Sequence, residues 1–347
     1  MKVDFIIVGQ GLSGTLLAHQ FESQGFSFFI IDEVQSNSSS RLAAGVMNPI
    51  TGRRFVKSWM YDTLLPKALD TYRYIENKLD CSLVSERNIL RIFPDQKQEN
   101  DWLARSGFSE YGRYILDDPS LGYFQPFDKK WRFGEVCGSY QIDIPQLLNR
   151  SRERWSQSDR IYEEKLDHHS LSLSRAVTYK KITASHIVFC EGERLRFNPL
   201  FKSNILDVSR GDVLLLKIPN LPVNKMIKKK YFLIRLAGDR FWFGAKNSWD
   251  IDDTLPSAEF KIDLIRALED LISVPYEIMD YKAAIRPTVQ DRRPIIGKHP
   301  DHTGVWVFNG LGTKGASLGP YWAEALTSAI TNQQSLPSEV DVSRFYS

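Results

Sequence analysis

The first 33 residues contain a complete β-α-β unit arranged around a glycine-rich turn. The apolar run from Val3 to Val8 is typical of a buried parallel strand. It leads directly into Gly9-Gln10-Gly11-Leu12-Ser13-Gly14, and apolar residues then recur at helical spacing. A second apolar run, Phe28 to Ile31, ends on Asp32-Glu33. This order of strand, glycines, helix, strand and acid predicts a dinucleotide site. A glycine-rich turn without a ligand is the alternative.

Each glycine of the turn has its own physical role in such a unit. Gly9 permits the tight turn, Gly11 lets the backbone approach a pyrophosphate, and Gly14 lets the helix pack close to the strand. The helix N-terminus adds unpaired N–H groups and the positive end of its dipole. Asp32, with Glu33 as the less favoured candidate, would accept a hydrogen bond from a ribose hydroxyl. The predicted cofactor contacts in this turn are Gly9, Gly11, Leu12, Ser13 and Gly14.

The overall charge argues against several classes of function. The 347 residues carry 45 basic and 42 acidic side chains, a net charge of +3. This near balance gives no electrostatic argument for nucleic acid or an anionic membrane. We interpret the densest basic run, Lys228-Lys229-Lys230, as a solvated turn. No stretch approaches the roughly 18 apolar residues of a membrane-spanning helix.

The cysteines and histidines bear on the compartment and on metal binding. Cys81, Cys137 and Cys190 stand far apart, which favours reduced thiols and a cytoplasmic location. We expect no secretion signal, because the N-terminal apolar run is needed as a strand and no small-residue cleavage site follows. His299 and His302 come closest to a metal-ligand pair, but a proline separates them and no further ligand is evident. We therefore predict no metal site.

The segment from Ser38 to Pro49 is rich in small residues, which suit a backbone pressed against a flat ligand. Gly45 would let the backbone meet a ring system, and Arg41 would pair with a phosphate. A flexible Ser-rich loop is the alternative. Arg53 and Arg54 follow, either as surface charges or as groups that recognise an acidic substrate. The predicted cofactor contacts here are Ser40, Arg41, Ala44, Gly45 and Met47.

The middle of the chain alternates regular elements with one irregular region. Residues 94–134 lack sustained periodicity, and we interpret them as a second domain or a large insertion. We expect Asp143 to cap a helix that has Pro145 in its first turn. Strands within 213–244, with a hairpin at Gly238-Asp239 and a covering helix, would form a wall of a substrate pocket. Further helices are expected over Tyr61–Leu79, Ala258–Ile272 and Tyr321–Ile330, and further strands over Arg87–Phe93 and Ile182–Val188.

A second glycine-rich turn lies near the end of the chain. The apolar run from Val305 to Asn309 leads into it, and a helix follows. An earlier strand also ends on a glycine, Gly192. One mononucleotide would not require both glycine turns, whereas a long, flat dinucleotide would, and on that count FAD fits better than NAD. The predicted cofactor contacts in the second turn are Gly310, Gly312, Thr313, Lys314, Gly315 and Ala316.

These motifs, in this order, resemble the D-amino-acid oxidase/glycine oxidase superfamily of FAD-dependent oxidoreductases. That superfamily also includes sarcosine oxidase and the oxidase half of the bifunctional tRNA wobble-uridine enzyme. The turn Gly310 to Gly315 is closest to the tRNA-modifying member, and Arg286-Pro287-Thr288 is closer to glycine oxidase. Residues 50–135 stand outside the resemblance. Other matching pieces are Gln141-Ile142-Asp143, Ile187 to Gly192, Arg210-Gly211-Asp212, Phe243-Gly244-Ala245 and Arg293 to Gly297.

The resemblance implies an α/β fold in which a Rossmann-like FAD-binding domain is interleaved with an antiparallel-sheet α+β substrate domain. It assigns 1–75, 136–208 and 288–347 to the FAD-binding domain, and 76–135 and 209–287 to the substrate domain. The implied reaction moves a hydride from the carbon bearing an amine to flavin N5, with dioxygen as acceptor. The family's covalent-flavin members carry a cysteine near Arg286, which this chain lacks, so we expect non-covalent FAD.

By their positions in the motifs that resemble the family, Arg286 and Lys314 are the candidate catalytic residues. Arg286 would bind a substrate carboxylate bidentately, and Lys314 would stabilise the reduced flavin, unless it is an exposed loop residue. The other substrate candidates are Arg53, Arg54, Tyr231 and Trp242, with core packing the favoured alternative for the two aromatics. We expect a small amine or amino acid as partner. The alternatives are a modified nucleoside on tRNA and a non-catalytic or electron-transfer flavoprotein.

Overall fold

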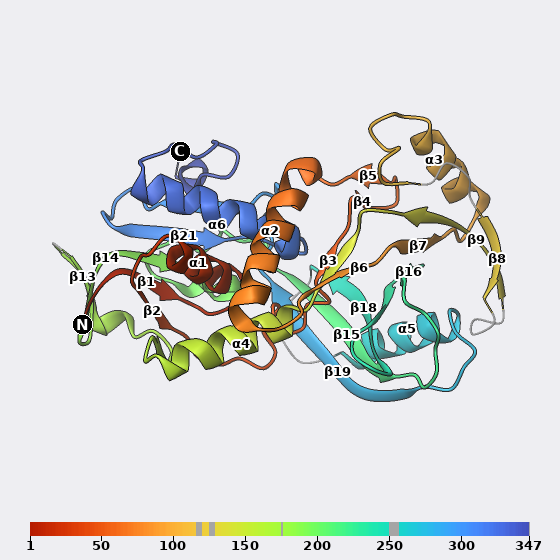
Figure 1. Cartoon of the computed structure of the whole chain (residues 1–347), viewed down its shortest axis with the longest axis horizontal. Coiled ribbons are helices and arrows are strands. Elements are labelled where there is room, and N and C mark those ends of the chain that lie inside the picture. Colours follow the sequence, from red (N-terminus) through yellow and green to blue (C-terminus); the bar gives the residue numbers. More distant parts are fainter. Residues whose placement is uncertain (116–119, 125–128, 175, 250–256, 347) are drawn as a thin grey trace.

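The computed structural model describes residues 1–115, 120–124, 129–174, 176–249 and 257–346. One end of the elongated molecule contains a largely parallel sheet with helices α1 (Leu12–Ser23), α4 (Ile144–Gln157) and α6 (Gly315–Thr331), and the other contains an antiparallel sheet with helix α5 (Ala258–Glu269) (Figure 1). Helix α2 (Tyr61–Leu79) runs between the two ends (Figure 1). Its bounds are those predicted from the sequence.

The parallel sheet is built around β1 (Lys2–Val8), which lies between β2 (Phe28–Ile31) and β14 (Ile182–Phe189). All three strands were predicted, and β1 and β14 each gain one residue. Their apolar residues are almost completely buried, as expected for strands covered on both faces. The sheet is completed by β11 (Ile161–Tyr162), β12 (Leu171–Leu173), β13 (Val177–Tyr179), β20 (Ile295–Lys298) and β21 (Val305–Asn309).

Three helices pack near this sheet: α1 (Leu12–Ser23), α4 (Ile144–Gln157) and α6 (Gly315–Thr331). The predicted cap of α4 is confirmed, since the Asp143 carboxylate accepts the Gln146 N–H at 2.9 Å. Helix α6 begins six residues before the predicted Tyr321. Its glycines serve helix packing rather than a turn, because a Cβ on Gly319 would lie 2.4 Å from Cδ1 of Leu16 in α1.

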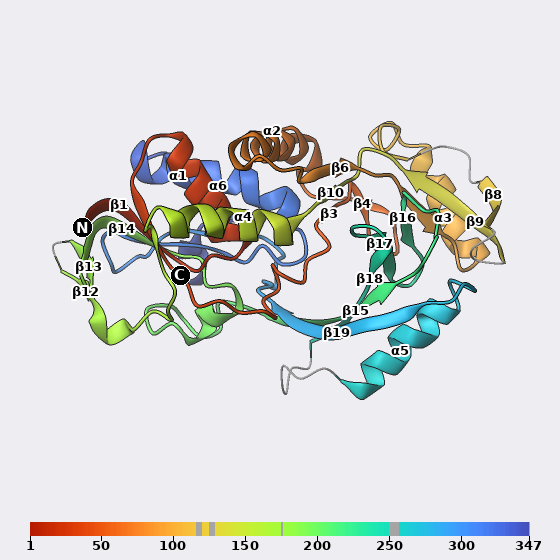
Figure 2. The same cartoon turned by 60° about the horizontal axis from the view of Figure 1, so that its bottom comes forward.

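The antiparallel sheet has the strand order β19-β15-β18-β17-β16-β7-β9-β8, and of its neighbouring pairs only β16 and β7 run parallel. The predicted hairpin at Gly238-Asp239 joins β17 to β18 and is confirmed. Helix α5 (Ala258–Glu269) covers one face, as Figure 2 shows. The strands are β7 (Ile89–Ile92), β8 (Ser120–Phe124), β9 (Lys129–Val136), β15 (Ser209–Lys217), β16 (Met226–Lys228), β17 (Phe232–Arg235), β18 (Arg240–Ser248) and β19 (Glu277–Arg286).

Side chains alternate between the two faces of this sheet. Leu214 and Phe243 are directly opposite each other and belong to the core cluster under α5. Leu215 and Trp242, the next pair, belong with the core cluster that includes α1 and α2. We call this second face, which points away from α5, the inner face.

One prediction for this part of the chain, the solvated turn at Lys228-Lys229-Lys230, was wrong, and the interpretation of residues 94–134 as a second domain or a large insertion stays a prediction. Residues 94–134 contain α3 (Gln96–Ser106) and parts of β8 and β9. Helix α3 buries Trp102 against Gly134. Its apolar face is too narrow for the sequence to show helical periodicity. Lys228 ends strand β16 and is half-buried rather than part of a solvated turn.

Small sheets connect the two ends. They comprise β3 (Val46–Met47), β10 (Tyr140–Ile142) and β6 (Val84–Glu86) in one sheet, and β4 (Ile50–Thr51) and β5 (Val56–Lys57) in another. The large sheets draw their strands from 2–31, 161–189 and 295–309, and from 89–136 and 209–286. The division into two discontinuous domains stays a prediction.

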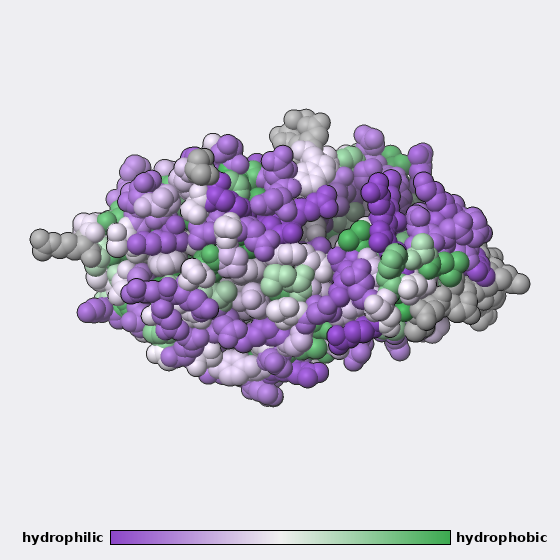
Figure 3. Space-filling model, turned by 90° about the horizontal axis from the view of Figure 1, so that it is seen from above, coloured by the Kyte–Doolittle hydropathy of each residue, from purple (hydrophilic) through white to green (hydrophobic). Residues whose placement is uncertain are grey.

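The described residues include no helix that combines the length and apolar character needed to cross a membrane. Hydrophilic side chains dominate the face of the molecule seen in Figure 3, and hydrophobic ones lie among them in small groups. His299, considered above for a metal site, is 2% exposed and its Nε2 lies 2.6 Å from the Leu200 carbonyl oxygen. It is therefore part of the packed interior.

Candidate cofactor and substrate site

The two glycine turns, from opposite ends of the sequence, lie side by side. Helices α1 and α6 run next to each other (Figure 2), and a Cβ on Gly315 would lie 2.9 Å from Cδ2 of Leu12. Neither helix has a side-chain cap at its N-cap residue, Gly11 or Lys314. Because first-turn N–H groups have no intrahelical acceptor, two positive helix ends meet at one place. This arrangement suits a ligand with anionic groups.

The first glycine turn is shaped by contacts that allow no side chain. Gly9 has φ +97°, and a Cβ there would lie 2.5 Å from the Cys190 carbonyl oxygen. A Cβ on Gly14 would lie 1.9 Å from the Gly9 carbonyl oxygen. By contrast, the Cβ position of Gly11 has only Ser40 Oγ nearby, at 3.3 Å. Gly9 and Gly14 are needed by the fold, while Gly11 leaves open the side from which a ligand would approach.

The two acids after β2 have different surroundings. Asp32 accepts the Gln10 N–H at 2.7 Å and an Arg152 Nη1–H at 2.7 Å. Since a carboxylate offers about four acceptor sites, Asp32 retains capacity for a hydroxyl. Glu33 instead pairs with Arg194 at 2.6 Å, on the surface. Asp32 is thus joined to the glycine turn through Gln10, and Glu33 is not. Arg152, which sequence reasoning missed, orients Asp32.

The small-residue segment after β2 contacts both the turn and the small sheet. Ser40 Oγ accepts the Leu12 N–H at 3.0 Å, and Arg41 Nη1 donates to Asn149 at 2.7 Å. Burial, and next the nearby Arg152, lower the pKa of Arg41. A Cβ on Gly45 would lie 1.8 Å from the Ile142 carbonyl oxygen.

Met47 is fully buried in β3, and Ala44 is 9% exposed. Since Met47 has no accessible surface, it supports the segment from behind. A direct contact between a flavin ring and Ala44, Gly45 or Met47 stays a prediction.

Asn309 links Gly192 to the second glycine turn and was missed in the sequence. Its Nδ2 donates to the Gly192 carbonyl oxygen at 2.9 Å, and its Oδ1 accepts the Gly310 N–H at 2.8 Å. Gly192 and Gly310 both have positive φ values, +60° and +72°. Asn309 is 1% exposed. A polar residue at the end of a buried strand, directly before a glycine turn, was the available signal.

The second turn presents a group of cations beside the start of α6. Thr313 is exposed, Lys314 is half-buried, and the Ala316 carbonyl oxygen accepts the Tyr72 hydroxyl at 2.9 Å. Burial lowers the pKa of Lys314, and the nearby Arg292 and Arg293 lower it further. Positive charge concentrated at a helix N-terminus favours an anionic group there.

Arg286 lies on the inner face of the antiparallel sheet. Its guanidinium lies over Gly211, where a Cβ would be 2.2 Å from Nη2, and Nη1 donates to Asn247 Oδ1 at 2.6 Å. Burial lowers the pKa of Arg286 to about 10. The nearby Asp212 carboxylate pairs with Arg210, at 2.7 Å. Among the described residues no carboxylate forms an ion pair with Arg286, so its guanidinium is available to an anion.

The remaining substrate candidates are dispersed. Tyr231 lies on the α5 side of the sheet, where its hydroxyl bonds Asp263, so it is on the opposite face from Arg286. Trp242 is 8% exposed and its Nε1 donates to the Leu42 carbonyl oxygen at 3.0 Å, joining the inner face to the small-residue segment.

Arg53 and Arg54 are exposed in the turn between β4 and β5. The Arg54 carbonyl oxygen accepts from Arg105 of α3 at 3.2 Å. This turn therefore borders the antiparallel sheet and α3 rather than the glycine turns.

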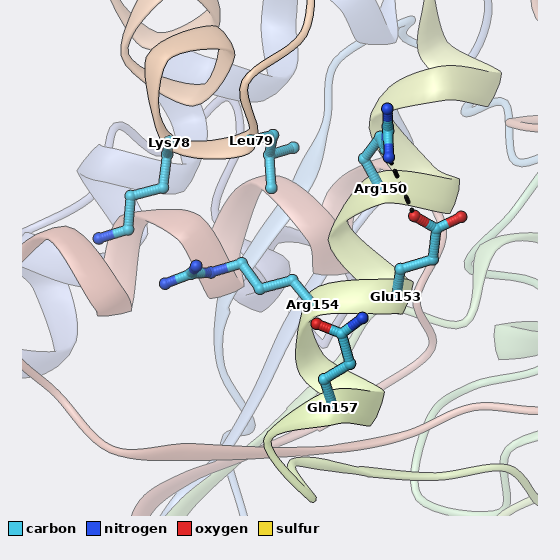
Figure 4. A pocket seen from close by; sticks show the side chains of 6 residues that line it. All are labelled: Lys78, Leu79, Arg150, Glu153, Arg154 and Gln157. Carbon is cyan, nitrogen blue, oxygen red and sulfur yellow. Dashed lines mark hydrogen bonds and ion pairs between the residues drawn. The ribbon is translucent and has the colours of Figure 1, made fainter.

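A surface pocket of about 200 Å³ lies elsewhere, between the last turn of α2 and α4 (Figure 4). Arg150 and Glu153 form an ion pair there at 3.5 Å. Lys78 and Arg154 both lie within 4 Å of Glu22, at 3.8 and 3.4 Å. Each cation of this pocket therefore has a carboxylate partner within the protein, and none of the predicted site residues lines it.

Comparison with known proteins identifies the family. The family model described as DAO, FAD dependent oxidoreductase, matches residues 4–329. The bifunctional tRNA 5-methylaminomethyl-2-thiouridine biosynthesis protein MnmC of Marinobacter nauticus is 21% identical over 398 residues, covering 98% of this chain. The match covers 58% of MnmC, so the chain spans little more than half of that relative's length.

Solved structures show the same fold. Iminodiacetate oxidase from Chelativorans sp. BNC1 superimposes with a TM-score of 0.78 at 18% identity, covering 97% of this chain and 99% of that one. Glycine oxidase from Geobacillus kaustophilus gives 0.79 at 17% identity, covering 96% of each chain. The predicted fold class, a Rossmann-like FAD-binding part combined with an antiparallel substrate part, is confirmed.

Proposed function

The chain belongs to the DAO family of FAD-dependent oxidoreductases, and from that premise we propose that it oxidises the C–N bond of an amine or amino acid. The observation that carries this proposal is Arg286, a guanidinium on the inner face with no carboxylate partner among the described residues. Such a group binds a carboxylate bidentately. Glycine oxidase and iminodiacetate oxidase, whose folds match, are named for substrates that contain both nitrogen and carboxylate.

The residues present fit FAD held without a covalent bond. The Cβ positions of Gly11 and Gly192 face open space or one hydroxyl, and the N-termini of α1 and α6 meet beside Gly11. We assign the pyrophosphate to the first turn, the ribose to Asp32 and the isoalloxazine end to the second turn. When bound, FAD would supply the acceptor for the hydride of the C–H bond on the amine-bearing carbon, while the nitrogen loses a proton and the C–N bond becomes C=N.

The protein's own contribution is positioning. Arg286 holds the carboxylate, and Asn247 fixes the plane of the guanidinium through its 2.6 Å hydrogen bond. The oxidised product is an imine, which water hydrolyses, and dioxygen is the electron acceptor in this proposal. Lys314, with its neighbours Arg292 and Arg293, supplies positive charge at the start of α6.

A panel of amines and amino acids, added without oxygen to the FAD-loaded protein, tests this function. We expect at least one compound to bleach the flavin and, in air, to yield peroxide. Arg286→Ala should retain FAD but lose a few kcal/mol of substrate affinity, the order observed for breaking a buried charge pair. Arg240→Ala, at an exposed site on β18, is the control. Unchanged kinetics in Arg286→Ala would remove Arg286 from the site.

The similarity to MnmC supports a second candidate, oxidation of a modified nucleoside on tRNA. The near-balanced charge of +3 weighs against it, because tRNA binding depends on basic surfaces. Filter binding with bulk tRNA at moderate salt separates the two candidates. Retention that falls with salt would favour the nucleoside, and no retention would end that candidate while leaving amine oxidation intact.

A further inference from the structure

The inner face carries a second pair of cations, Arg91 and Lys228. Lys228 of β16 is the register partner of Arg91 in β7. Met226, two residues before Lys228, belongs to the inner core cluster, whereas Ile227 belongs to the cluster under α5. Because side chains alternate along a strand, Lys228 and its partner Arg91 project from the inner face. They therefore lie on the same face of the sheet as Arg286.

Lys228 has no anionic partner among the described residues. Its Nζ donates to the Lys230 carbonyl oxygen at 3.1 Å and lies 4.5 Å from the centre of the Phe232 ring. The side chain is only half-buried, yet burial lowers its pKa to about 7, with Arg91 as the next cause. Arg286 combines partial exposure and a burial-lowered pKa in the same way.

Arg91 is also without a carboxylate in the part of the chain that the structure describes. It donates to Gln98 Oε1 at 3.3 Å and lies 5.4 Å from the Phe55 ring centre. Its Nε is buried and has no hydrogen-bond partner. Lys228 and Arg91 are in register on adjacent strands, which lie about 5 Å apart, so their like charges repel each other and an anion between them would relieve this.

We propose that Lys228 and Arg91 bind a second anionic group of the substrate, a carboxylate or a phosphate. The substrate would then be an amine or amino acid with an anion remote from the oxidised carbon. This inference rests on the proposed function for its first anchor, Arg286. Phe232, half-buried beside Lys228, leaves an apolar surface for the part of the substrate that reaches it, whereas Phe55, beside Arg91, is fully buried.

The sheet geometry sets the length of such a substrate. Lys228 is two strands from β18, so it lies roughly 10 Å across the sheet from that strand. Lys228 pairs with Phe232, and Phe232 pairs with Gly244 of β18, so these three residues lie in one row across the sheet. Asn247, the hydrogen-bond partner of Arg286, follows Gly244 by three residues, roughly 10 Å along β18. The Arg286 guanidinium already lies at Asn247, so only the Lys228 side chain shortens this diagonal. We therefore expect the two anions to be separated by a chain of several carbons, longer than that of glutamate.

Binding of non-oxidisable acids to the FAD-loaded protein tests the second site without using activity. Pimelate and heptanoate have the same carbon count and differ by one carboxylate. We expect pimelate to bind at least tenfold more tightly by calorimetry, and Lys228→Met to bind the two acids equally. Lys230→Met is the matched control, because Lys230 is exposed and pairs with Asp263. Equal wild-type affinities would overturn the proposal, whether or not the variants fold.

Oxidation of α-amino dicarboxylates, compared with that of α-amino acids that carry a terminal phosphonate, shows whether the second anionic group is a carboxylate or a phosphate. We expect kcat/KM to rise along the series from five to eight carbons and to fall when the distal acid is an amide. If simple amino acids are oxidised and a distal anion has no effect, this inference is wrong and the proposed function stands. If no amine is oxidised but pimelate still binds through Lys228, the proposed function fails and the anion site survives.

Discussion

Leu12 and Gly315 are in contact, although they lie near opposite ends of the sequence. A Cβ on Gly315 would be 2.9 Å from Cδ2 of Leu12. This contact brings the first turns of α1 and α6 together, so that the N–H groups of both helices face one place. In the proposed function a dinucleotide spans the two turns and is recognised there by backbone atoms, which would account for the glycines in both.

Gly14→Ala is expected to prevent FAD binding. The added Cβ would lie 1.9 Å from the Gly9 carbonyl oxygen, which is backbone and cannot move without opening the turn. We expect a loss of several kcal/mol in stability, the range of severe overpacking. The measurements are flavin content after purification and the thermal unfolding midpoint. Gly25→Ala is the control, because its Cβ meets nothing within 4 Å and only the positive φ is strained. Comparable flavin content in the two variants would contradict this account.

Gly211→Ala should weaken substrate binding and leave FAD in place. The Cβ would lie 2.2 Å from Nη2 of Arg286, at the end of a flexible side chain that can turn away. We expect KM to rise by about tenfold, equivalent to about 1.4 kcal/mol. Steady-state kinetics on any substrate identified, with flavin content as a check, measure this effect. Gly107→Ala, whose Cβ would have its nearest neighbour at 4.0 Å, should behave as the wild type.

Trp242→Phe tests the connection between the inner face and the small-residue segment. The change removes the Nε1–H that donates to the Leu42 carbonyl oxygen at 3.0 Å and leaves that acceptor unpaired. A loss of about 1 kcal/mol in unfolding free energy is expected, because a part-buried acceptor loses its hydrogen bond. Urea unfolding gives the value, with the exposed Trp249→Phe for comparison. An equal effect in the two variants would show that the hydrogen bond is unimportant.

Glu191 makes stability depend on pH. Burial raises its pKa from 4.5 to about 7, although the hydrogen bond from Asn198 and the charge of Arg194 act in the opposite direction. The folded state thus favours the protonated carboxyl. Its stability contribution is complete below pH 4.5 and is lost as pH rises through about 7.

Glu191→Gln should therefore be more stable than the wild type at pH 8.5, by about 1–2 kcal/mol, and similar at pH 5. Glutamine keeps an acceptor for Asn198 and never ionises. Denaturant unfolding at the two pH values measures the difference. Glu153→Gln, at an exposed ion pair, should show little change with pH. A stability difference that is the same at both pH values would refute the assignment.

Local patterns were sufficient for the elements whose signal is contained in neighbouring residues. The strand β1, the glycine turn after it, the full length of α2 and the Asp143 cap of α4 were all predicted correctly. In each case the determining interactions, a buried apolar run, a helical stripe or a cap, lie within a few residues of one another.

Tertiary structure decided the rest, because those features depend on contacts between distant segments. Helix α3 is held by Trp102 on Gly134, and α6 begins early because Gly319 packs on Leu16. Which face of the sheet a residue occupies cannot be known until its strands are paired. Pairing placed Tyr231 under α5 and put Lys228 on the inner face with Arg286. The sequence by itself was enough to predict two glycine turns after buried strands and, from them, a dinucleotide cofactor. Only the packing of the sheet decided which charges face the place where a substrate would lie.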